Sequence, residues 1–228
     1  MEARRAAQGD TGTLSIGCFG LAEPRFFPKL LHAYRAQYPA VRIHVCEQSP
    51  DEQLDALELG RIDVGVTAAL PETKARRLVQ ERVFSAGVVA VLPDRHPLAS
   101  LRKISLEKLA NDDWVLLRRS SAPELVDALT LLCTKAGFSP RIIAEPANMQ
   151  TMLITVFSGI GVSLAPTCVA SFHQPGVTLI PIQPDPPPLE IVAARPKGEP
   201  SPAAAAFLEM LRQQLPAIRS KYAYHHST

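Results

Sequence analysis

The first third of the chain alternates short apolar runs with helical patterns. An apolar run at Gly12–Gly17 precedes a helical pattern that ends near Pro39, and a second run, Val41–Cys46, precedes a helix that ends at Gly60. A third run has apolar side chains at alternate positions up to Thr67. Strand–helix–strand order with short connections predicts a parallel sheet with right-handed crossovers. Because ligands bind at the carboxyl ends of such strands, we expect a small-molecule site on the loops that follow them.

Two groups of polar residues and prolines mark the beginnings of helices. Ser49 precedes Pro50 and is followed three positions later by Glu52, a pattern typical of an N-cap, a first-turn proline and a capping box. Ser121 and Glu124 repeat this spacing further along the chain. We therefore expect one helix to begin after Ser49 and another after Ser121.

The middle of the chain repeats the alternation of strands and helices. Further strands are predicted at Gly87–Leu92, Trp114–Leu117, Arg141–Ala144 and Val162–Leu164. The proline-rich run Pro184–Pro188 is typical of a stiff connector, and a strand at Leu189–Ala194 and a final helix follow it. Because this last pair has no sheet of its own, we expect it to return to the first domain.

These patterns predict an α/β fold with two Rossmann-like lobes and a ligand cleft between them. We expect residues 12–85 and 188–220 to form the first lobe, and residues 86–187 to form a second lobe inserted into it. Residues 221–228 are expected to be a tail. Two chain crossings between the lobes would act as a hinge.

Composition narrows the classes of protein that fit. The 228 residues are 46% hydrophobic and 20% charged, as in ordinary globular proteins. The formal net charge of +2 gives no electrostatic reason for this chain to hold nucleic acid by itself. No signal-peptide core and no apolar run of about 20 residues is visible. We therefore expect a cytoplasmic protein without membrane contact.

Candidate catalytic and metal-binding residues form no recognisable pattern. The six histidines lack metal-site spacing, and no nucleophile is paired with a base. The cysteines Cys18, Cys46, Cys133 and Cys168 are widely spaced and are expected to be reduced thiols, with a redox role for Cys18 left open. We expect no metal, no cofactor and no catalysis. A solute-binding protein or a metabolic enzyme on the same two-lobed fold remains the alternative.

Five motifs resemble, in order, the effector-binding region of LysR-type transcriptional regulators. They are Ala6–Gly17, Phe27–Leu31 with Tyr38-Pro39, Leu57–Gly65, Asp94–Leu98 and Ser158–Pro166. Each motif alone is weak, but five in family order over nearly the whole chain are specific. The resemblance implies the fold of type 2 periplasmic binding proteins, with residues 1–11 as the end of a linker helix or a tail. It also implies a small-molecule sensor that controls transcription.

The same resemblance implies the partners of this chain. Members of the family carry an N-terminal winged helix-turn-helix domain, to which nothing in this sequence corresponds. We therefore expect promoter DNA to be bound only through that absent domain. The first helix, Phe26–Tyr38, and the strand Val41–Cys46 are expected to meet the other lobe of a second copy. This arrangement would give a homodimer of the fragment and a homotetramer of the full regulator.

Helix N-termini at the carboxyl ends of the strands favour an anion, because their free N–H groups carry partial positive charge. We therefore expect the effector to be a small organic anion, a carboxylate above all, held by eight residues. They are Phe19, Leu21, Ser49 and Thr67 in the first lobe and Arg118, Ser120, Ser121 and Gln150 in the second. Phe19 and Leu21 would contact the apolar part of the ligand, and Ser49 and Ser121 have a purely structural alternative as helix caps.

Two positions in the first lobe depart from the family pattern. Leu21 stands where family members that bind aromatic carboxylates often present serine or threonine, and Ala68 stands where some carry an arginine. These departures weaken an assignment to benzoate or muconate.

Overall fold

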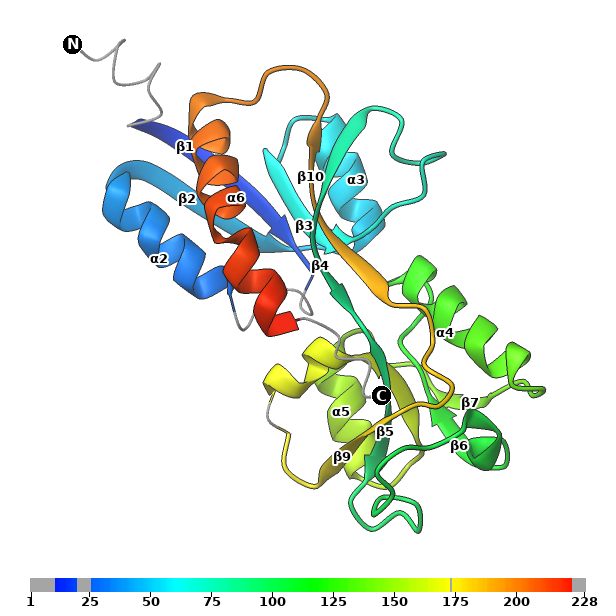
Figure 1. The fold of residues 1–228 in the computed structure, drawn as a ribbon. Helices are drawn as coiled ribbons and strands as arrows, with labels where there is room; N and C mark the ends of the chain where they lie inside the picture. The colour runs from blue at the N-terminus through cyan, green and yellow to red at the C-terminus, as the bar shows by residue number, and fades with distance from the viewer. Residues whose placement is uncertain (1–10, 20–25, 173, 223–228) are drawn as a thin grey trace. The chain divides into compact units, whose positions relative to one another are not determined.

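The computed structural model describes residues 11–19, 26–172 and 174–222, which fall into two compact units (Figure 1). Unit 1 contains the described residues up to Ser85 and those from Glu190 onward. Unit 2 contains Ala86–Leu189. The chain therefore passes between the units at Ser85–Ala86 and again at Leu189–Glu190.

Unit 1 is built on a five-stranded sheet with the order β2-β1-β3-β10-β4. The strands are β1 (Thr11–Cys18), β2 (Ala40–Glu47), β3 (Val64–Ala68), β4 (Leu78–Ala86) and β10 (Leu189–Pro196). β1 pairs in parallel with both β2 and β3, as the alternation of strands and helices predicts. β10 pairs antiparallel with β3, so the last strand of the chain joins the sheet of unit 1. β4, at the sheet edge, was not expected from the sequence.

Helices cover both faces of the sheet of unit 1. α2 (Phe27–Gln37) and α6 (Pro202–Tyr222) lie side by side on one face, and α3 (Pro50–Glu58) covers the other (Figure 1). Tyr34 of α2 and Phe207 of α6 are fully buried and meet edge to face, with ring centroids 5.7 Å apart. The Tyr34 hydroxyl donates to the carbonyl oxygen of Ala203 at 2.9 Å. Burial raises the pKa of Tyr34 to about 12, so this hydroxyl stays protonated and keeps its hydrogen bond.

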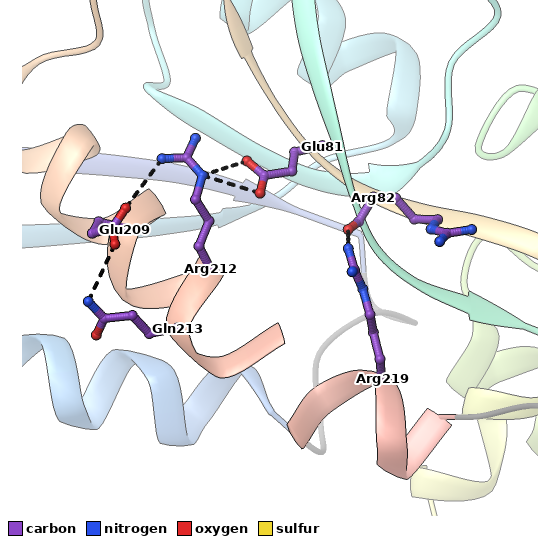
Figure 2. A network of polar contacts seen from close by, with 6 residues as sticks. All are labelled: Glu81, Arg82, Glu209, Arg212, Gln213 and Arg219. Carbon is purple, nitrogen blue, oxygen red and sulfur yellow. Dashed lines mark hydrogen bonds and ion pairs between the residues drawn. The ribbon is translucent and has the colours of Figure 1, made fainter. Parts of the chain in front are cut away.

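Arginines of α6 bind the edge strand β4 (Figure 2). The Nε atom of Arg212 lies 2.9 and 3.2 Å from the two carboxylate oxygens of Glu81. Arg219 donates from Nε to the carbonyl oxygen of Val83 at 3.1 Å and from Nη2 to that of Arg82 at 2.6 Å. These bonds satisfy carbonyl groups of the strand that leads out of unit 1.

Side chains also join the two strands at which the chain leaves and re-enters unit 1. Ser85 Oγ donates to Glu190 Oε1 at 2.8 Å, and Glu190 Oε2 lies 3.7 Å from Arg82 Nε. The carbonyl oxygen of Glu190 accepts from the N–H of Ala69. The ends of β3, β4 and β10 are thereby held together within unit 1.

Unit 2 has two small sheets. One is antiparallel with the order β8-β5-β9, and the other is the parallel pair β6-β7. Its strands are β5 (Val88–Pro93), β6 (Asp113–Val115), β7 (Arg141–Ala144), β8 (Ser163–Pro166) and β9 (Val177–Pro181). Its helices are η1 (Leu106–Leu109), α4 (Pro123–Lys135), α5 (Met149–Phe157) and η2 (Thr167–Phe172). The strand β9 was not expected from the sequence.

Trp114 occupies the core of unit 2. Its side chain is fully buried, donates from Nε1 to the carbonyl oxygen of Leu109 at 3.2 Å and packs on Phe138 at 5.7 Å between centroids. Val162 donates its N–H to Asp113, and its carbonyl oxygen accepts from Val115. The segment after α5 therefore lies directly against the backbone of β6.

Candidate functional site

The ends of β1, β2 and β3 are tied together at one edge of the sheet of unit 1. The N–H of Phe19 donates to the carbonyl oxygen of Val66 at 3.2 Å, and the N–H of Gln48 donates to that of Cys18 at 2.8 Å. Phe19 is half-buried at this edge, and Leu21 lies outside the described residues. The carboxyl edge therefore brings together Phe19, Ser49 and Thr67 of the eight predicted effector-binding residues.

Ser49 caps α3 in the way that the sequence predicts. Its Oγ accepts from the N–H of Glu52 at 3.3 Å, and its own N–H donates to Glu52 Oε2 at 2.7 Å. Pro50 has no N–H, so the capping box and the proline leave few free donors at this helix N-terminus. Asp51 and Glu52 also place negative charge in the first turn. The local geometry at α3 therefore favours the structural role of Ser49 over the binding of an anion.

The capping box makes the stability of the chain depend on pH. Hydrogen bonds to Ser49, first that from its backbone N–H, hold the pKa of Glu52 below its ordinary value of 4.5. Because the pKa of Glu52 is lower in the folded than in the unfolded chain, its ionised carboxylate stabilises the folded chain at pH values above the unfolded pKa. This contribution is lost as the pH falls through the folded pKa. The excess stability of the unmodified chain over Glu52→Gln should therefore shrink in urea unfolding as the pH falls from 7 to below 4.5. A difference that stays constant across this range would contradict the assignment.

Four buried side-chain oxygen atoms of unit 1 have no hydrogen-bond partner among the residues that the structure describes. One of them, Glu190 Oε2, lies 3.7 Å from Arg82 Nε, and the other three are Gln48 Oε1, Gln53 Oε1 and Thr67 Oγ1. Thr67 is 1% exposed and Gln53 is fully buried. Sequence reasoning proposed Thr67 but missed both glutamines, because their burial depends on the glycines Gly17 and Gly65 beneath them.

Unit 2 has its own carboxyl edge, at the ends of β6 and β7. The N–H of Leu116 donates to the carbonyl oxygen of Ala144 at 3.2 Å, and that of Arg118 donates to Pro146 at 2.9 Å. The two strand ends therefore run side by side toward the starts of α4 and α5. This pairing brings Arg118, Ser120 and Ser121 to the same edge of unit 2 as Gln150.

The predicted cap at Ser121 is wrong. The N-cap of α4 is Ala122, which has no side-chain oxygen, and no side chain caps the helix. Pro123 occupies the first helical position, and the N–H of Ser121 instead closes a turn by donating to the carbonyl oxygen of Arg118. Ser120 is exposed and Ser121 is half-buried. Ser121 therefore has a hydroxyl that is not used as a helix cap.

The two neighbouring arginines at this edge have different surroundings. Arg119 forms a bidentate pair with Asp127, with both N···O distances at 2.7 Å. Arg118 is exposed, and its side chain makes no hydrogen bond or ion pair within the described part of the chain. Arg118 is therefore the arginine whose guanidinium group remains available to a ligand.

The start of α5 suits an anion better than the start of α3. Asn148 Oδ1 caps the helix by accepting from the N–H of Thr151 at 2.9 Å, and no acidic residue lies in the first turn. The exposed Gln150 occupies the second position of the helix. No residue in the first turn of α5 therefore offsets the partial positive charge of this N-terminus.

The thiols with resolved pKa shifts are poor nucleophiles. Burial raises the pKa of Cys46, and it raises that of Cys133 to about 12, so both stay protonated near neutral pH. Cys46 Sγ lies 3.5 Å from the carbonyl oxygen of Ile16. Within residues 11–19, 26–172 and 174–222, no group of three His, Cys, Asp or Glu residues is placed to hold a metal ion. No helix in these ranges is both long and apolar enough to span a membrane.

The chain is similar to known regulators in sequence and in fold. The profile of the LysR substrate binding domain matches residues 7–216. The HTH-type transcriptional regulator AlsR of Bacillus subtilis (strain 168) is 32% identical over 77% of this chain, which spans 58% of AlsR. The C-terminal domain of a probable LysR family regulator from Rhodococcus sp. RHA1 superposes with a TM-score of 0.77 at 27% identity, covering 89% of this chain and 99% of that domain.

A further solved structure shares the fold. The effector binding domain of BenM, with its effector benzoate, has a TM-score of 0.78 and 24% identity, covering 92% of this chain and 94% of that domain. The predicted α/β fold of the periplasmic-binding-protein type is thus confirmed. The profile match spans most of the sequence, including the sheets of both units. The chain belongs to the LysR substrate binding domain family.

Proposed function

We propose that this chain binds a small organic anion, a carboxylate above all, and thereby controls transcription. Promoter DNA would be bound by a helix-turn-helix domain outside this sequence. The observation that carries the proposal is the carboxyl edge of unit 2. There the unpaired guanidinium group of Arg118 and the acid-free N-terminus of α5 favour a negative charge. Ser120, Ser121 and Gln150 supply neutral hydrogen-bonding groups at the same edge. A thermal-shift screen against carboxylates tests the proposal.

Unit 1 would contribute the rest of the ligand site. Phe19 offers an apolar contact at the carboxyl edge, and Thr67 and Ser49 lie at the same edge. We propose that binding of the effector stabilises one arrangement of the chain over another. A population shift of this kind requires a difference in affinity between the arrangements, for which a coupling of about 1–3 kcal/mol is typical. Regulation would then need no chemical change in the ligand.

Apolar side chains on two edge strands support self-association. β2 is an outer strand of its sheet and exposes Val45 by 45%. β7 belongs to a two-stranded sheet and exposes Ile142 by 41% and Ile143 by 49%. Exposed apolar edge strands favour pairing with another chain. We propose that a second copy covers these surfaces, giving a homodimer here and a homotetramer of the full regulator.

Light scattering at high micromolar concentration should show a dimer of the unmodified chain. Ile143→Glu places a charge on the exposed edge and should shift the equilibrium toward monomer, because a buried unpaired carboxylate opposes association. Leu59→Glu is the matched control, since Leu59 is 70% exposed at the end of α3. A monomer of the unmodified chain at this concentration would contradict the proposed assembly.

A further inference from the structure

Three of the buried unpaired oxygens of unit 1, Gln48 Oε1, Gln53 Oε1 and Thr67 Oγ1, lie on one face of its sheet. Gly17 of β1 and Gly65 of β3 are direct neighbours in the register. A Cβ atom on Gly17 would lie 2.9 Å from Gln48 Oε1, and one on Gly65 would lie 2.6 Å from Gln53 Oε1. Thr67 is two residues further along β3, hence on the same face and about 7 Å away along the strand. The glycine pair leaves room for both amide groups beside the end of β3.

Backbone bonds fix Gln48 at this edge. Its N–H donates to the carbonyl oxygen of Cys18 at 2.8 Å, and its carbonyl oxygen accepts from Gln53 Nε2 at 3.0 Å. Gln53 is thus a positioning residue, fully buried beneath the edge. Gln48 directly follows β2, and Thr67 lies near the end of β3. Each has an unpaired buried oxygen, Gln48 Oε1 and Thr67 Oγ1. Buried acceptors are normally paired, so these two oxygens call for a hydrogen-bond donor.

Charges near this edge also favour a donor over an anion. The first turn of α3 contains the carboxylates of Asp51 and Glu52, and Lys74 pairs with Asp51 at 2.9 Å. Position 68, directly after Thr67, is alanine. The Thr67 hydroxyl can donate or accept, but Gln48 Oε1 can only accept, and the first turn of α3 adds like charge that opposes a carboxylate. A hydroxyl or ammonium group of the ligand could donate to both oxygens. The carboxyl edge of unit 2, with Arg118, has the opposite preference.

We propose that the effector carries a hydrogen-bond donor, a hydroxyl or ammonium group, in addition to its anionic group, and that Gln48 Oε1 and Thr67 Oγ1 accept from it. This inference rests on the proposed function and names the ligand class: hydroxy acids and amino acids. The donor of the ligand binds at the carboxyl edge of unit 1.

Thermal-shift titrations of matched pairs test this assignment. Each pair compares a 2-hydroxy or 2-amino acid of three to six carbons with the parent acid that lacks the donor. The donor-bearing member of at least one pair should bind about tenfold more tightly than its parent. This factor is the gain in affinity expected from one hydrogen bond to a buried acceptor. Thr67→Val and Gln48→Met should each reduce this advantage by about 3- to 10-fold, a larger loss than either variant causes in the affinity for the parent acid.

Two surface variants serve as controls. Thr134→Val changes an exposed threonine on α4, and Gln213→Met changes an exposed glutamine on α6. Both should leave the advantage of the donor unchanged, and urea unfolding verifies that all four variants fold. Parent acids that bind as tightly as their donor-bearing partners would overturn the inference and leave the proposed anion sensor intact. If no organic anion binds, the proposed function and this inference both fail.

Discussion

Gly161→Ala should unfold unit 2 at far lower urea concentrations than the unmodified chain. A Cβ atom at this position would fall on the carbonyl oxygen of Asp113, with the carbonyl carbon at 2.9 Å and the N atom of Trp114 at 3.3 Å. These are backbone atoms of β6, so no side chain can rotate away to make room. We expect a loss of about 3 kcal/mol or more in the free energy of unfolding, at the upper end for overpacking.

Trp114 reports this change directly. It is the only tryptophan of the sequence and is fully buried, so its fluorescence follows the unfolding of unit 2. Gly137→Asn is the matched control, because an added side chain meets no atom within 4 Å there and asparagine tolerates the positive φ of 86°. The control should change stability by less than about 1 kcal/mol. Equal midpoints for Gly161→Ala and the unmodified chain would show that the segment after α5 does not pack on β6 as described.

Arg118→Ala should weaken the binding of an organic anion by about 10- to 100-fold, which corresponds to a charge-assisted hydrogen bond of about 1.5–3 kcal/mol. Arg118 is exposed at the start of the loop into α4, whereas the guanidinium group of Arg119 is held by Asp127. Arg118→Lys should lose less affinity than Arg118→Ala, since lysine keeps the positive charge but lacks the planar guanidinium group that can form two parallel hydrogen bonds. Isothermal titration of the tightest-binding carboxylate measures the loss.

Arg102→Ala is the control for this prediction. Arg102 is another exposed arginine of unit 2, outside the loop into α4. Its removal lowers the net charge by the same amount, so it separates a general electrostatic effect from a local contact. Similar losses for the two variants, or an unchanged affinity in Arg118→Ala, would exclude Arg118 as a ligand contact.

Apart from β4, the order of strands and helices in unit 1 could be predicted because local signals and tertiary packing agree there. Pro50 and Ser49 set the start of α3, and alternate apolar residues set β3. β4 and β9 lack such signals, because burial along them does not alternate and one side of each stays partly exposed. Strands of this kind are recognised only by their pairing partners, which are distant in sequence.

The accuracy of the predicted site was limited by contacts between residues that are distant in the sequence. Ser121 looked like a helix cap, but the start of α4 is set by Pro123, one residue later than expected. The choice between Arg118 and Arg119 depends on Asp127, which only the turn of α4 brings within reach. Gln48 and Gln53 gave no signal, because a glutamine after a strand is ordinary in a loop and becomes unusual only when buried over glycines.

The most direct test of the sensor function is a thermal-shift screen of the unmodified chain against carboxylates, with neutral and cationic compounds of similar size as controls. A ligand at 100 times its Kd should stabilise the chain by about 2.7 kcal/mol. We expect one or more carboxylates to raise Tm in a concentration-dependent way and to be recovered chemically unchanged, as NMR of the supernatant would show. A shift caused only by neutral or cationic compounds, or conversion of the bound carboxylate into a product, would contradict the account.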